Sequence, residues 1–489
     1  WNEAKTRSMM IDAMLIQAGW DVTNPEQVGQ EFEVAFPNNP SGKGFVDYVL
    51  WGDNGQPLAV AEAKKSGNTN LQAGREQARL YADAFEDMGY QRPVIFYSNG
   101  YETFIWDDKQ YNTYRPVYGF YSKESLEYLI YQRNYRVDTL EQNNPDLNIA
   151  DRPYQIEAIK TVAAHFQGQR RKALVIQATG TGKTRVSIAL AELMLRTGWA
   201  KRVLFLCDRK ELRIQADEAF KQFLPSEPRC VIGETNKIDQ AARIYIATYP
   251  GMLNRFAQLD VGFFDLIIAD ESHRSIYNKY GDLFHYFDAL QVGLTATPVK
   301  FNSRHTYTMF DCEVNDPTFD FGLDAAINNE PPYLVPFKVK DFTTEFLREG
   351  IHYNDLSDKQ NSQLEEDLGE DEAKKTTIAG KDIGRKIFSE QTDKIILENL
   401  INNGIQDETG SLVGKTIIFA QRQEHAEHLE KMFCQLYPQY GSRVCKVIHN
   451  KIPHVASLIK EFKRPNNDFR VAISVDMLDT GIDVPEVVN

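Results

Sequence analysis

Apolar positions along this chain follow two periods, and the switches between them mark the predicted elements. Near the N-terminus, short apolar runs bounded by Gly, Pro and Asn predict strands, while apolar residues three and four positions apart predict helices. Helices are expected at 2–18 and 70–85, and strands at 45–51, 58–63, 92–99 and 101–106. These elements predict a small α/β domain.

From residue 153 onward the pattern becomes a regular alternation of apolar strands and amphipathic helices. Strand cores are expected at 174–176, 202–207, 243–248, 264–269 and 291–295. This alternation is typical of a parallel sheet with helices on both faces, which binds ligands at the carboxyl ends of its strands.

The α/β pattern resumes at 414–420 and 469–476, after a polar stretch that covers 341–386. Residues 365–372 in that stretch are nearly all acidic, which favours a solvated helix or a mobile insertion. The 489-residue length agrees with about three domains. We expect domains at 1–140, 153–335 and 336–489, the last truncated at its C-terminus, with a linker at 141–152.

The amino-acid composition excludes only a few classes of protein. A net charge of −14 argues against a nonspecific cationic DNA coat but leaves room for local basic grooves. The five cysteines are scattered, odd in number and without metal-binding spacing, which predicts reduced thiols in a cytoplasmic protein. No segment has the length and apolar character of a membrane span.

The sequence QATGTGKT at residues 177–184 joins an apolar strand to an amphipathic helix. Glycines let backbone N–H groups surround a phosphate, and the following helix adds the positive end of its dipole. This pattern predicts a P-loop for ATP and Mg²⁺, in which Lys183 reaches the phosphates and Thr184 is a magnesium ligand. The strict motif has Gly at the position of Gln177, so a Gly-rich turn without a ligand is the alternative. The predicted nucleotide-binding residues of the loop are Thr179, Gly180, Thr181, Gly182, Lys183 and Thr184.

Four further motifs stand around this loop in the order found in superfamily 2 helicases, which the region resembles. They are Arg152-Pro-Tyr-Gln155, Asp270-Glu-Ser-His273, Thr295-Ala-Thr297-Pro and Asp479-Thr-Gly-Ile-Asp483. The resemblance implies two parallel-sheet lobes of the RecA-like type. It also implies that Asp270 binds the magnesium of ATP and that Glu271 activates the attacking water.

The same resemblance assigns the remaining motor residues. Arg152 and Gln155 are expected at the adenine, which a glutamine amide can contact through two hydrogen bonds. The remaining residues expected at the nucleotide are His273, which links it to the lobe interface, Gly481 and Asp483. Contacts to the DNA backbone are expected from Arg209, Thr248 and Thr480.

A pair of carboxylates marks the N-terminal domain. If Asn54-Gly55 is a two-residue hairpin turn, Asp47 lies opposite Glu62, and Lys64 shares the face of Glu62. Opposed residues have Cβ atoms roughly 5 Å apart, where two carboxylates repel unless a cation lies between them. Pro57 could introduce a bulge and shift this register. An exposed hairpin with solvated charges is the alternative.

The Asp and Glu-x-Lys pattern resembles PD-(D/E)xK nucleases, although the Pro before the Asp is absent. The next predicted helix carries Gln77 and Tyr81 on one face, as in the RecB-like branch of those nucleases. The resemblance implies that Asp47 and Glu62 bind Mg²⁺ and that Lys64, Gln77 and Tyr81 complete the catalytic site. Glu3 is a further candidate, with a solvated helix terminus as the alternative.

A nuclease placed before a helicase-like motor resembles the R subunit of type I restriction–modification enzymes. Type III subunits place the nuclease after the motor. The resemblance implies ATP-driven translocation and cleavage of double-stranded DNA, with methyltransferase and specificity subunits as partners. The alternatives are a stand-alone repair helicase-nuclease and a motor with a noncatalytic N-terminal docking domain. The sequence stops at Asn489, before the arginine-rich motif of the family, so this chain is expected to bind ATP but hydrolyse it poorly.

Overall fold

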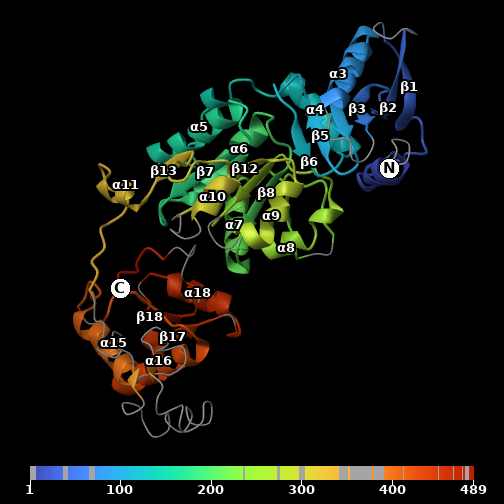
Figure 1. Cartoon of the computed structure of the whole chain (residues 1–489). Helices are drawn as coiled ribbons and strands as arrows, with labels where there is room; N and C mark the ends of the chain where they lie inside the picture. Colours follow the sequence, from blue (N-terminus) through green and yellow to red (C-terminus); the bar gives the residue numbers. More distant parts are fainter. Residues whose placement is uncertain are drawn as a thin grey trace, which may run out of the picture. The chain divides into compact units, whose positions relative to one another are not determined.

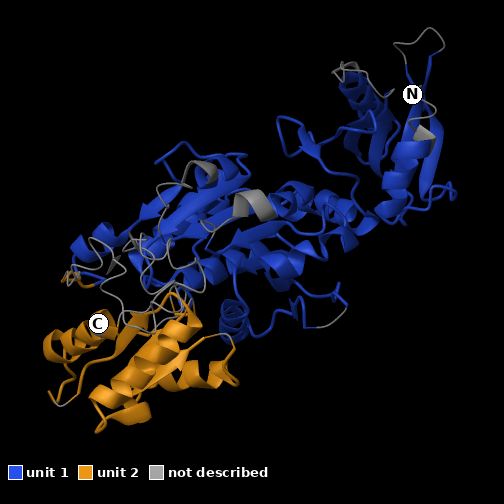
Figure 2. Ribbon diagram, turned by 60° about the horizontal axis from the view of Figure 1, so that its bottom comes forward, with its two compact units in different colours: residues 1–334 blue, residues 335–489 orange. Residues whose placement is uncertain are grey.

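A computed structural model divides the chain into two compact units, residues 1–334 and 335–489 (Figure 2). The structure describes residues 7–36, 42–64, 72–234, 237–271, 276–296, 303–340, 351–352, 377–378, 390–410, 412–449, 451–465, 467–475, 477–478 and 484–489. No helix within these ranges is both long and apolar enough to cross a membrane.

The first unit begins with a six-stranded mixed sheet in the order β1-β2-β3-β4-β5-β6. Only β3 and β4 run parallel; the other neighbours are antiparallel. The strands are β1 (Val28–Ala35), β2 (Lys43–Trp51), β3 (Pro57–Ala63), β4 (Val94–Ser98), β5 (Thr103–Trp106) and β6 (Arg115–Val117). The predicted strands at 45–51, 58–63, 92–99 and 101–106 are confirmed, while β1 and β6 escaped the sequence pattern.

Helices cover both faces of this sheet (Figure 1). They are η1 (Arg7–Ile11), α2 (Asp12–Gln17), α3 (Gln72–Asp87) and α4 (Lys123–Tyr135). Because side chains alternate along a strand, Val49, Val60 and Ile95 pack with α3 in one cluster, whereas Leu50, Ala59 and Phe96 belong to another. The helix expected at 2–18 is η1 plus α2 over the described residues; Glu3 lies outside them.

The hairpin that joins β2 to β3 differs from the expected two-residue turn. Gly52 N–H donates to the Gln56 carbonyl, and Gly55, with φ of +71°, donates to the Gly52 carbonyl. The loop therefore turns about Asp53 and Asn54, and a register shift follows between Leu50 and Trp51. Beyond this bulge Tyr48 pairs with Ala61. That register is the one predicted, because the loop and the bulge compensate each other.

The second part of the first unit is built on a seven-stranded sheet in the order β13-β7-β12-β11-β8-β10-β9. Every neighbouring pair is parallel. The strands are β7 (Lys172–Gln177), β8 (Val203–Cys207), β9 (Arg229–Val231), β10 (Ile244–Thr248), β11 (Leu266–Ala269), β12 (Leu290–Thr295) and β13 (Phe319–Phe321). The predicted parallel α/β class is confirmed, and the short strands β9 and β13 were missed.

Helices connect the parallel strands and place their carboxyl ends at one edge of the sheet. They are α5 (Pro153–Gln167), α6 (Lys183–Arg196), α7 (Lys210–Phe223), α8 (Tyr249–Leu253), α9 (Ile276–Tyr286), α10 (Ser303–Met309) and α11 (Leu323–Asn328), with 3₁₀ turns η2 (Leu140–Gln142) and η3 (Phe256–Gln258). The stretch expected to be a linker packs closely here, because Leu140, Ile149 and Ala150 are buried in the core. The predicted domain boundaries remain predictions.

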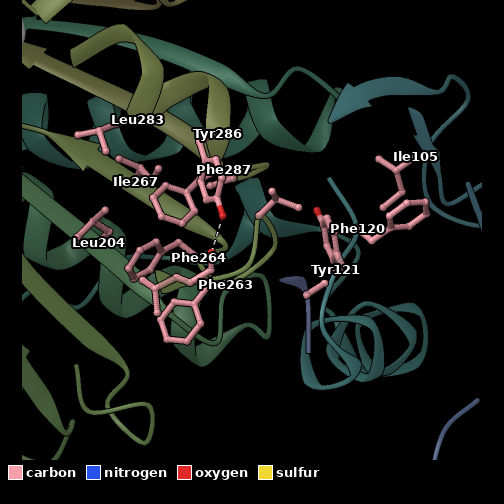
Figure 3. Packing of buried hydrophobic residues seen from close by; sticks show 14 of the residues in the cluster. Ile105, Phe120, Tyr121, Leu204, Phe263, Phe264, Ile267, Leu283, Tyr286 and Phe287 are labelled. Atoms are coloured by element: carbon pink, nitrogen blue, oxygen red, sulfur yellow. Dashed lines mark hydrogen bonds between the residues drawn. The ribbon is translucent and has the colours of Figure 1, made fainter. Parts of the chain in front are cut away.

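A continuous apolar core joins the two sheets of the first unit (Figure 3). Phe120 and Tyr121, just before α4, belong to the same buried cluster as Phe264 and Phe287 of the seven-stranded sheet region. Polar contacts accompany this core. Asp288 accepts hydrogen bonds from Arg115 at 2.8 Å and Arg171 at 3.0 Å. We call the residues Arg115, Tyr121, Arg171, Asp265 and Asp288, with the core around them, the seam.

The second unit contains a three-stranded parallel sheet in the order β16-β18-β17. Its elements are β16 (Thr416–Phe419), β17 (Cys445–Ile448), β18 (Val471–Ser474), α15 (Glu390–Asn403), α16 (Gln423–Leu436), α17 (Gly441–Val444) and α18 (Val455–Lys463). A two-residue pair, β14 (Ile351–His352) with β15 (Thr377–Ile378), is antiparallel. The strands predicted at 414–420 and 469–476 are confirmed, and the acidic run 365–372 lies outside the described residues.

Candidate nuclease and nucleotide sites

The structure brings the two predicted nuclease carboxylates to the sheet face that α3 covers. Asp47 lies on β2 beside Val46 and Tyr48, and Glu62 lies near the end of β3. Both are buried, with 8% and 3% of their surface exposed. The Ala63 N–H donates to Asp47 Oδ2 at 2.7 Å, so the strand that carries Glu62 also holds the Asp47 side chain. A buried carboxylate pair of this kind does not fit the alternative of solvated hairpin charges.

A chain of hydrogen bonds runs from β3 across to α3. Lys64 Nζ contacts Glu62 Oε1 at 2.7 Å and donates to Gln77 Oε1 at 2.9 Å. Gln77 Nε2 in turn donates to the Tyr81 hydroxyl at 2.9 Å. The geometry therefore places Glu62, Lys64, Gln77 and Tyr81 in one connected network.

Two local features of the chain make this network possible. Gln77 and Tyr81 are one helical turn apart, so their side chains meet on the same face of α3. Gly74 lies one turn earlier, and a Cβ atom there would come within 3.2 Å of the Lys64 side chain. Glycine at position 74 thus leaves room for the lysine to extend along the helix toward Gln77.

The electrostatics of the site keep Tyr81 protonated. Burial raises the pKa of the Tyr81 hydroxyl, the hydrogen bond from Gln77 opposes that effect, and the negative charges of Glu62 and Asp47 raise the pKa further. A protonated hydroxyl accepts from Gln77 while keeping its own proton to donate. Tyr81 therefore orients the amide whose oxygen accepts from Lys64.

The carboxylates fit a magnesium ion that is completed by other ligands. Mg²⁺ prefers oxygen and is commonly held by one or two carboxylates, with waters and a substrate phosphate in the remaining positions. Asp47 and Glu62 supply such oxygens on adjacent strands. Over the residues that the structure describes, no group of three or more His, Cys, Asp or Glu side chains could hold a metal. Asp47 and Glu62 are thus two oxygen ligands that such an ion could use.

The predicted phosphate loop lies between β7 and α6. Gly180 and Gly182 have φ of +84° and +88°, in the left-handed region that favours glycine. Gly182 also has no room for a side chain, since a Cβ atom would lie 2.6 Å from Gln155 Nε2. Lys183 begins α6, and Thr179 and Thr184 are exposed. The loop has the backbone conformation that exposes N–H groups to a phosphate.

The carbonyl of Thr181 collects three hydrogen bonds within this loop. Tyr154 donates its hydroxyl at 2.6 Å, Gln155 its amide nitrogen at 2.9 Å and Gln177 its amide nitrogen at 3.0 Å. Sequence reasoning missed Tyr154, and it treated Gln177 only as a departure from the motif. In the structure, Gln177 is fully buried and ties the strand end to the loop, which a glycine could not do.

This arrangement changes the expectation for Gln155. Its amide nitrogen is committed to Thr181, and its Oε1 atom is buried without a hydrogen-bond partner in the described part of the chain. A bidentate contact to adenine needs both atoms. As placed here, Gln155 has only its oxygen available for a base. Arg152 lies close by and donates to the Tyr154 hydroxyl at 2.9 Å.

The predicted acidic motif follows β11 at the same sheet edge. Glu271 is buried, with 2% exposed, and its Oε1 lies 3.5 Å from Lys183 Nζ. Its φ of +52° is uncommon for a residue with a side chain, and such strain is found at functional sites. The Asp270 carboxylate accepts from the Glu271 N–H at 3.0 Å. Lys183, Asp270 and Glu271 are therefore neighbours, as phosphoryl-transfer chemistry requires.

The other predicted motor residues are less informative. Arg209 lies just before α7 and contacts Asp208 at 3.6 Å, and the Thr248 hydroxyl accepts from Gly251 N–H at the start of α8. Arg209 follows β8 and Thr248 ends β10, at the edge of the sheet that also carries the phosphate loop. Four predicted residues lie outside the described ranges, namely His273, Thr480, Gly481 and Asp483. Thr297 of the Thr295-Ala-Thr297-Pro motif also lies outside them.

Comparison with known proteins identifies relatives of both parts. The model for "Type I restriction enzyme R protein N terminus" matches residues 27–113, and that for "Type III restriction enzyme, res subunit" matches 148–300. The EcoKI endonuclease subunit of Escherichia coli K12 is 25% identical over 98% of this chain and 48% of its own length. The EcoAI endonuclease subunit of Escherichia coli is 27% identical over 98% of this chain and 60% of its own.

The chain thus spans roughly half the length of these curated relatives, 48% and 60%. Among solved structures, a fragment ascribed to an HsdR subunit of a type I restriction enzyme from Vibrio vulnificus YJ016 covers 99% of this chain and 85% of that one. Its TM-score is 0.46 and its identity 21%. The match to the type I N-terminal model precedes the match to the res-subunit model along the chain, in the order that the sequence predicts.

Proposed function

This chain is a relative of the R subunits of type I restriction enzymes, and we propose from that premise that it is an ATP-driven DNA translocase and Mg²⁺-dependent endonuclease. The substrate is unmodified double-stranded DNA. One observation carries the proposal. A buried carboxylate–lysine–glutamine–tyrosine network and a glycine-formed phosphate loop with an acidic neighbour belong to the same compact unit.

The nuclease residues divide the work of phosphodiester hydrolysis. A Mg²⁺ ion held by Asp47 and Glu62 would polarise the scissile phosphate and lower the pKa of the attacking water. Lys64 lies 2.7 Å from Glu62, so its ammonium group reaches the same phosphate and stabilises the charge that develops on it. Gln77 and Tyr81 keep Lys64 in that position. All five residues come from a sheet and one helix, which gives a rigid site.

The nucleotide residues fit hydrolysis of ATP with magnesium. Backbone N–H groups around Gly180 and Gly182 and the ammonium of Lys183 surround the phosphates. Thr184 and Asp270 would hold the magnesium that neutralises phosphate charge. Glu271, 3.5 Å from Lys183, is placed to accept a proton from the attacking water. Arg209, Thr248 and Thr480 are proposed to contact the DNA backbone as the motor moves.

The proposal includes partner subunits that recognise the DNA sequence. The R subunit works beside a specificity subunit and methyltransferase subunits in a cytoplasmic complex. Contacts to the sugar-phosphate backbone fix a protein on DNA without reading its bases. In this division the chain moves along the DNA and cleaves it, and the partners recognise the target sequence.

The test is cleavage by the complete complex of this subunit with its specificity and methyltransferase partners. DNA carrying an unmodified recognition site is expected to be cut when ATP and Mg²⁺ are both present, and the same DNA methylated at that site is expected to stay intact. DNA without a site serves as the control. Equal cleavage of all three DNAs would favour a stand-alone helicase-nuclease instead. ATPase without any cleavage would favour a noncatalytic N-terminal domain.

A further inference from the structure

The last residues of the first unit lie against the RPYQ segment and the phosphate loop. We infer that Tyr333 and Arg152 form a stacking platform for the nucleotide base. This inference rests on the proposed ATP site and adds a residue that no motif marks. Tyr333 lies between α11 and Val335, the first residue of the second unit.

The ring of Tyr333 is held in place from both sides. Its own N–H and that of Leu334 both donate to the Ala326 carbonyl of α11, at 2.9 and 3.2 Å. Its ring meets the edge of Tyr154 with centroids 4.7 Å apart and planes at 74°. Tyr154 is stacked on Phe321 of β13 at 4.0 Å with nearly parallel planes. Three aromatic rings from separate segments therefore form one packed group.

Arg152 completes a flat cationic surface at the edge of this group. Its guanidinium lies 5.5 Å from the centre of the Tyr333 ring and donates to the Tyr154 hydroxyl at 2.9 Å. Arg152 is exposed and Tyr333 is half-buried, so both retain surface that a ligand can cover. The guanidinium lies over the Tyr333 ring, and nucleobases stack on aromatic rings and on guanidinium planes of this kind.

The platform is tied directly to the phosphate loop. Tyr154, which touches both Arg152 and Tyr333, donates its hydroxyl to the Thr181 carbonyl at 2.6 Å. Leu334 approaches the loop as well, because a Cβ atom on Gly180 would lie 3.4 Å from its side chain. A nucleotide with its phosphates in the loop therefore has its sugar and base beside residues 152–155 and 333–334.

In this arrangement, different atoms stack on the base and distinguish one base from another. Every nucleobase has a π-face, so a platform of Tyr333 and Arg152 strengthens binding without selecting one base. Gln155 Oε1 is buried and has no hydrogen-bond partner in the described part of the chain. That oxygen can accept from the amino group at adenine position 6 but is repelled by the carbonyl oxygen of guanine. Gln155 therefore sets the preference for adenine, and Tyr333 the affinity.

The experiment measures ADP and GDP binding to the complete chain by calorimetry with Mg²⁺. Tyr333→Ala is expected to weaken both nucleotides by about ten-fold, the loss that corresponds to one stacking contact. Tyr333→Leu keeps apolar volume but loses the ring, so it should show the same loss of affinity. It replaces Tyr333→Ala as the test if the alanine variant perturbs folding. Tyr333→Phe should bind within about two-fold of wild type, because it keeps the ring. Val335→Ala, two residues further along the chain and 83% exposed, is the matched control.

The ratio of ADP to GDP affinity separates the possible outcomes. Unchanged binding in Tyr333→Ala and Tyr333→Leu, with ADP still bound by wild type, would overturn the platform and leave the ATP site standing. A changed ratio of ADP to GDP affinity in these variants would also contradict the platform, since we assign the preference for adenine to Gln155. If wild type and Lys183→Ala bind ADP equally weakly, the proposed ATP site itself fails.

Discussion

The two candidate sites of this chain differ in how much of the fold each requires. The nuclease residues come from two neighbouring strands and one helix; four of them form one hydrogen-bonded chain, and Asp47 accepts from the Ala63 N–H beside Glu62. The described nucleotide residues come from the start of α5, the β7–α6 loop and the end of β11. The nuclease site is self-contained, whereas the nucleotide site is assembled from distant parts of the chain.

This difference fits the task that each site is proposed to have. The proposed motor changes its nucleotide site during its cycle, and a site built from several distant segments suits such a change. A nuclease gains from a rigid arrangement in which carboxylates and lysine keep fixed positions. The seam lies between them and joins both sheets by one apolar core. We therefore expect the nuclease domain to follow the first motor lobe as one body.

The largest effect is expected from the phosphate loop. Lys183→Ala removes the ammonium group that lies 3.5 Å from Glu271, and ATPase activity should fall on the order of 10²-fold or more. DNA cleavage should fall with it, since cleavage depends on translocation. Lys172→Ala, which removes a lysine at the other end of β7, is the control and should keep both activities. Full ATPase in Lys183→Ala would remove the distinction between the two sites.

The seam should contribute strongly to stability. Asp288 is buried between Arg115 and Arg171, and Asp288→Asn leaves both guanidinium groups without their carboxylate. Breaking a buried ion pair costs about 3–5 kcal/mol of unfolding free energy, which denaturant titration can measure. The control is Asp311→Asn, whose side chain is 67% exposed and 3.5 Å from Lys172. A surface pair of this kind is expected to change stability by less than about 1 kcal/mol.

If both substitutions had equal effects, the seam would be no more than a surface contact. If Asp288→Asn lowered stability but the two sheets then unfolded in separate transitions, the buried core alone would not join them. Our account predicts a single transition for the first unit in wild type, because its apolar cluster is continuous across the seam.

The hairpin shows what local sequence patterns can and cannot predict. A turn centred on Asn54-Gly55 predicted that Asp47 lies opposite Glu62, and the Tyr48–Ala61 pairing confirms that register. The turn itself was predicted wrongly, because Asn54-Gly55 also fits a longer loop with glycine in the left-handed region. The predicted pairing of the two strands stays correct after such an error only when a bulge restores the register, as happens at Leu50.

Contacts between distant segments could not be predicted from the sequence. Tyr154 and Gln177 both donate to the Thr181 carbonyl, yet neither pattern nor motif pointed to that shared acceptor. The segment 141–152 looked like a linker because it is rich in Asn, Asp and Pro, but Ile149 and Ala150 within it are buried in the core. Composition reports what a segment contains, whereas burial depends on what the rest of the chain places beside it.

The seam also predicts a pH dependence with two opposite contributions. Burial raises the pKa of Asp265 to about 6, against the hydrogen bonds from the Arg202 and Lys201 backbone. Its contribution to stability is therefore present below the unfolded pKa near 3.9 and is lost as pH rises through about 6. Burial opposes ionisation of Asp288 as well, but Arg115 and Arg171 hold its pKa well below the usual range. The Asp288 contribution is present above pH ~4 and is lost as pH falls.

Asp265→Asn isolates the first of these contributions. Wild type should lose up to about 3 kcal/mol from this group between pH ~4 and ~6.5, and Asp265→Asn should lack that decrease. Denaturant titration at half-unit pH steps measures the difference between the two curves. Parallel curves for both proteins would show that Asp265 does not titrate in this range.

The smallest expected effect tests how the nuclease network is held. Tyr81→Phe removes the hydroxyl that accepts from Gln77 at 2.9 Å but leaves both carboxylates and Lys64 in place. We expect DNA cleavage to slow by about ten-fold, because Lys64 loses a fixed partner rather than its charge. ATPase should not change. A loss as large as that from removing a carboxylate would make Tyr81 a direct participant in the reaction.

The most direct test of a self-contained nuclease beside a separate motor is Glu62→Gln in the complete complex. Cleavage of unmodified DNA and ATP hydrolysis are measured on the same sample, with Asp53→Asn at the exposed hairpin tip as the control. Our account predicts that cleavage falls on the order of 10³-fold, while DNA-stimulated ATPase stays within about two-fold of wild type. Cleavage at the wild-type rate, or an equal loss of both activities, would contradict it.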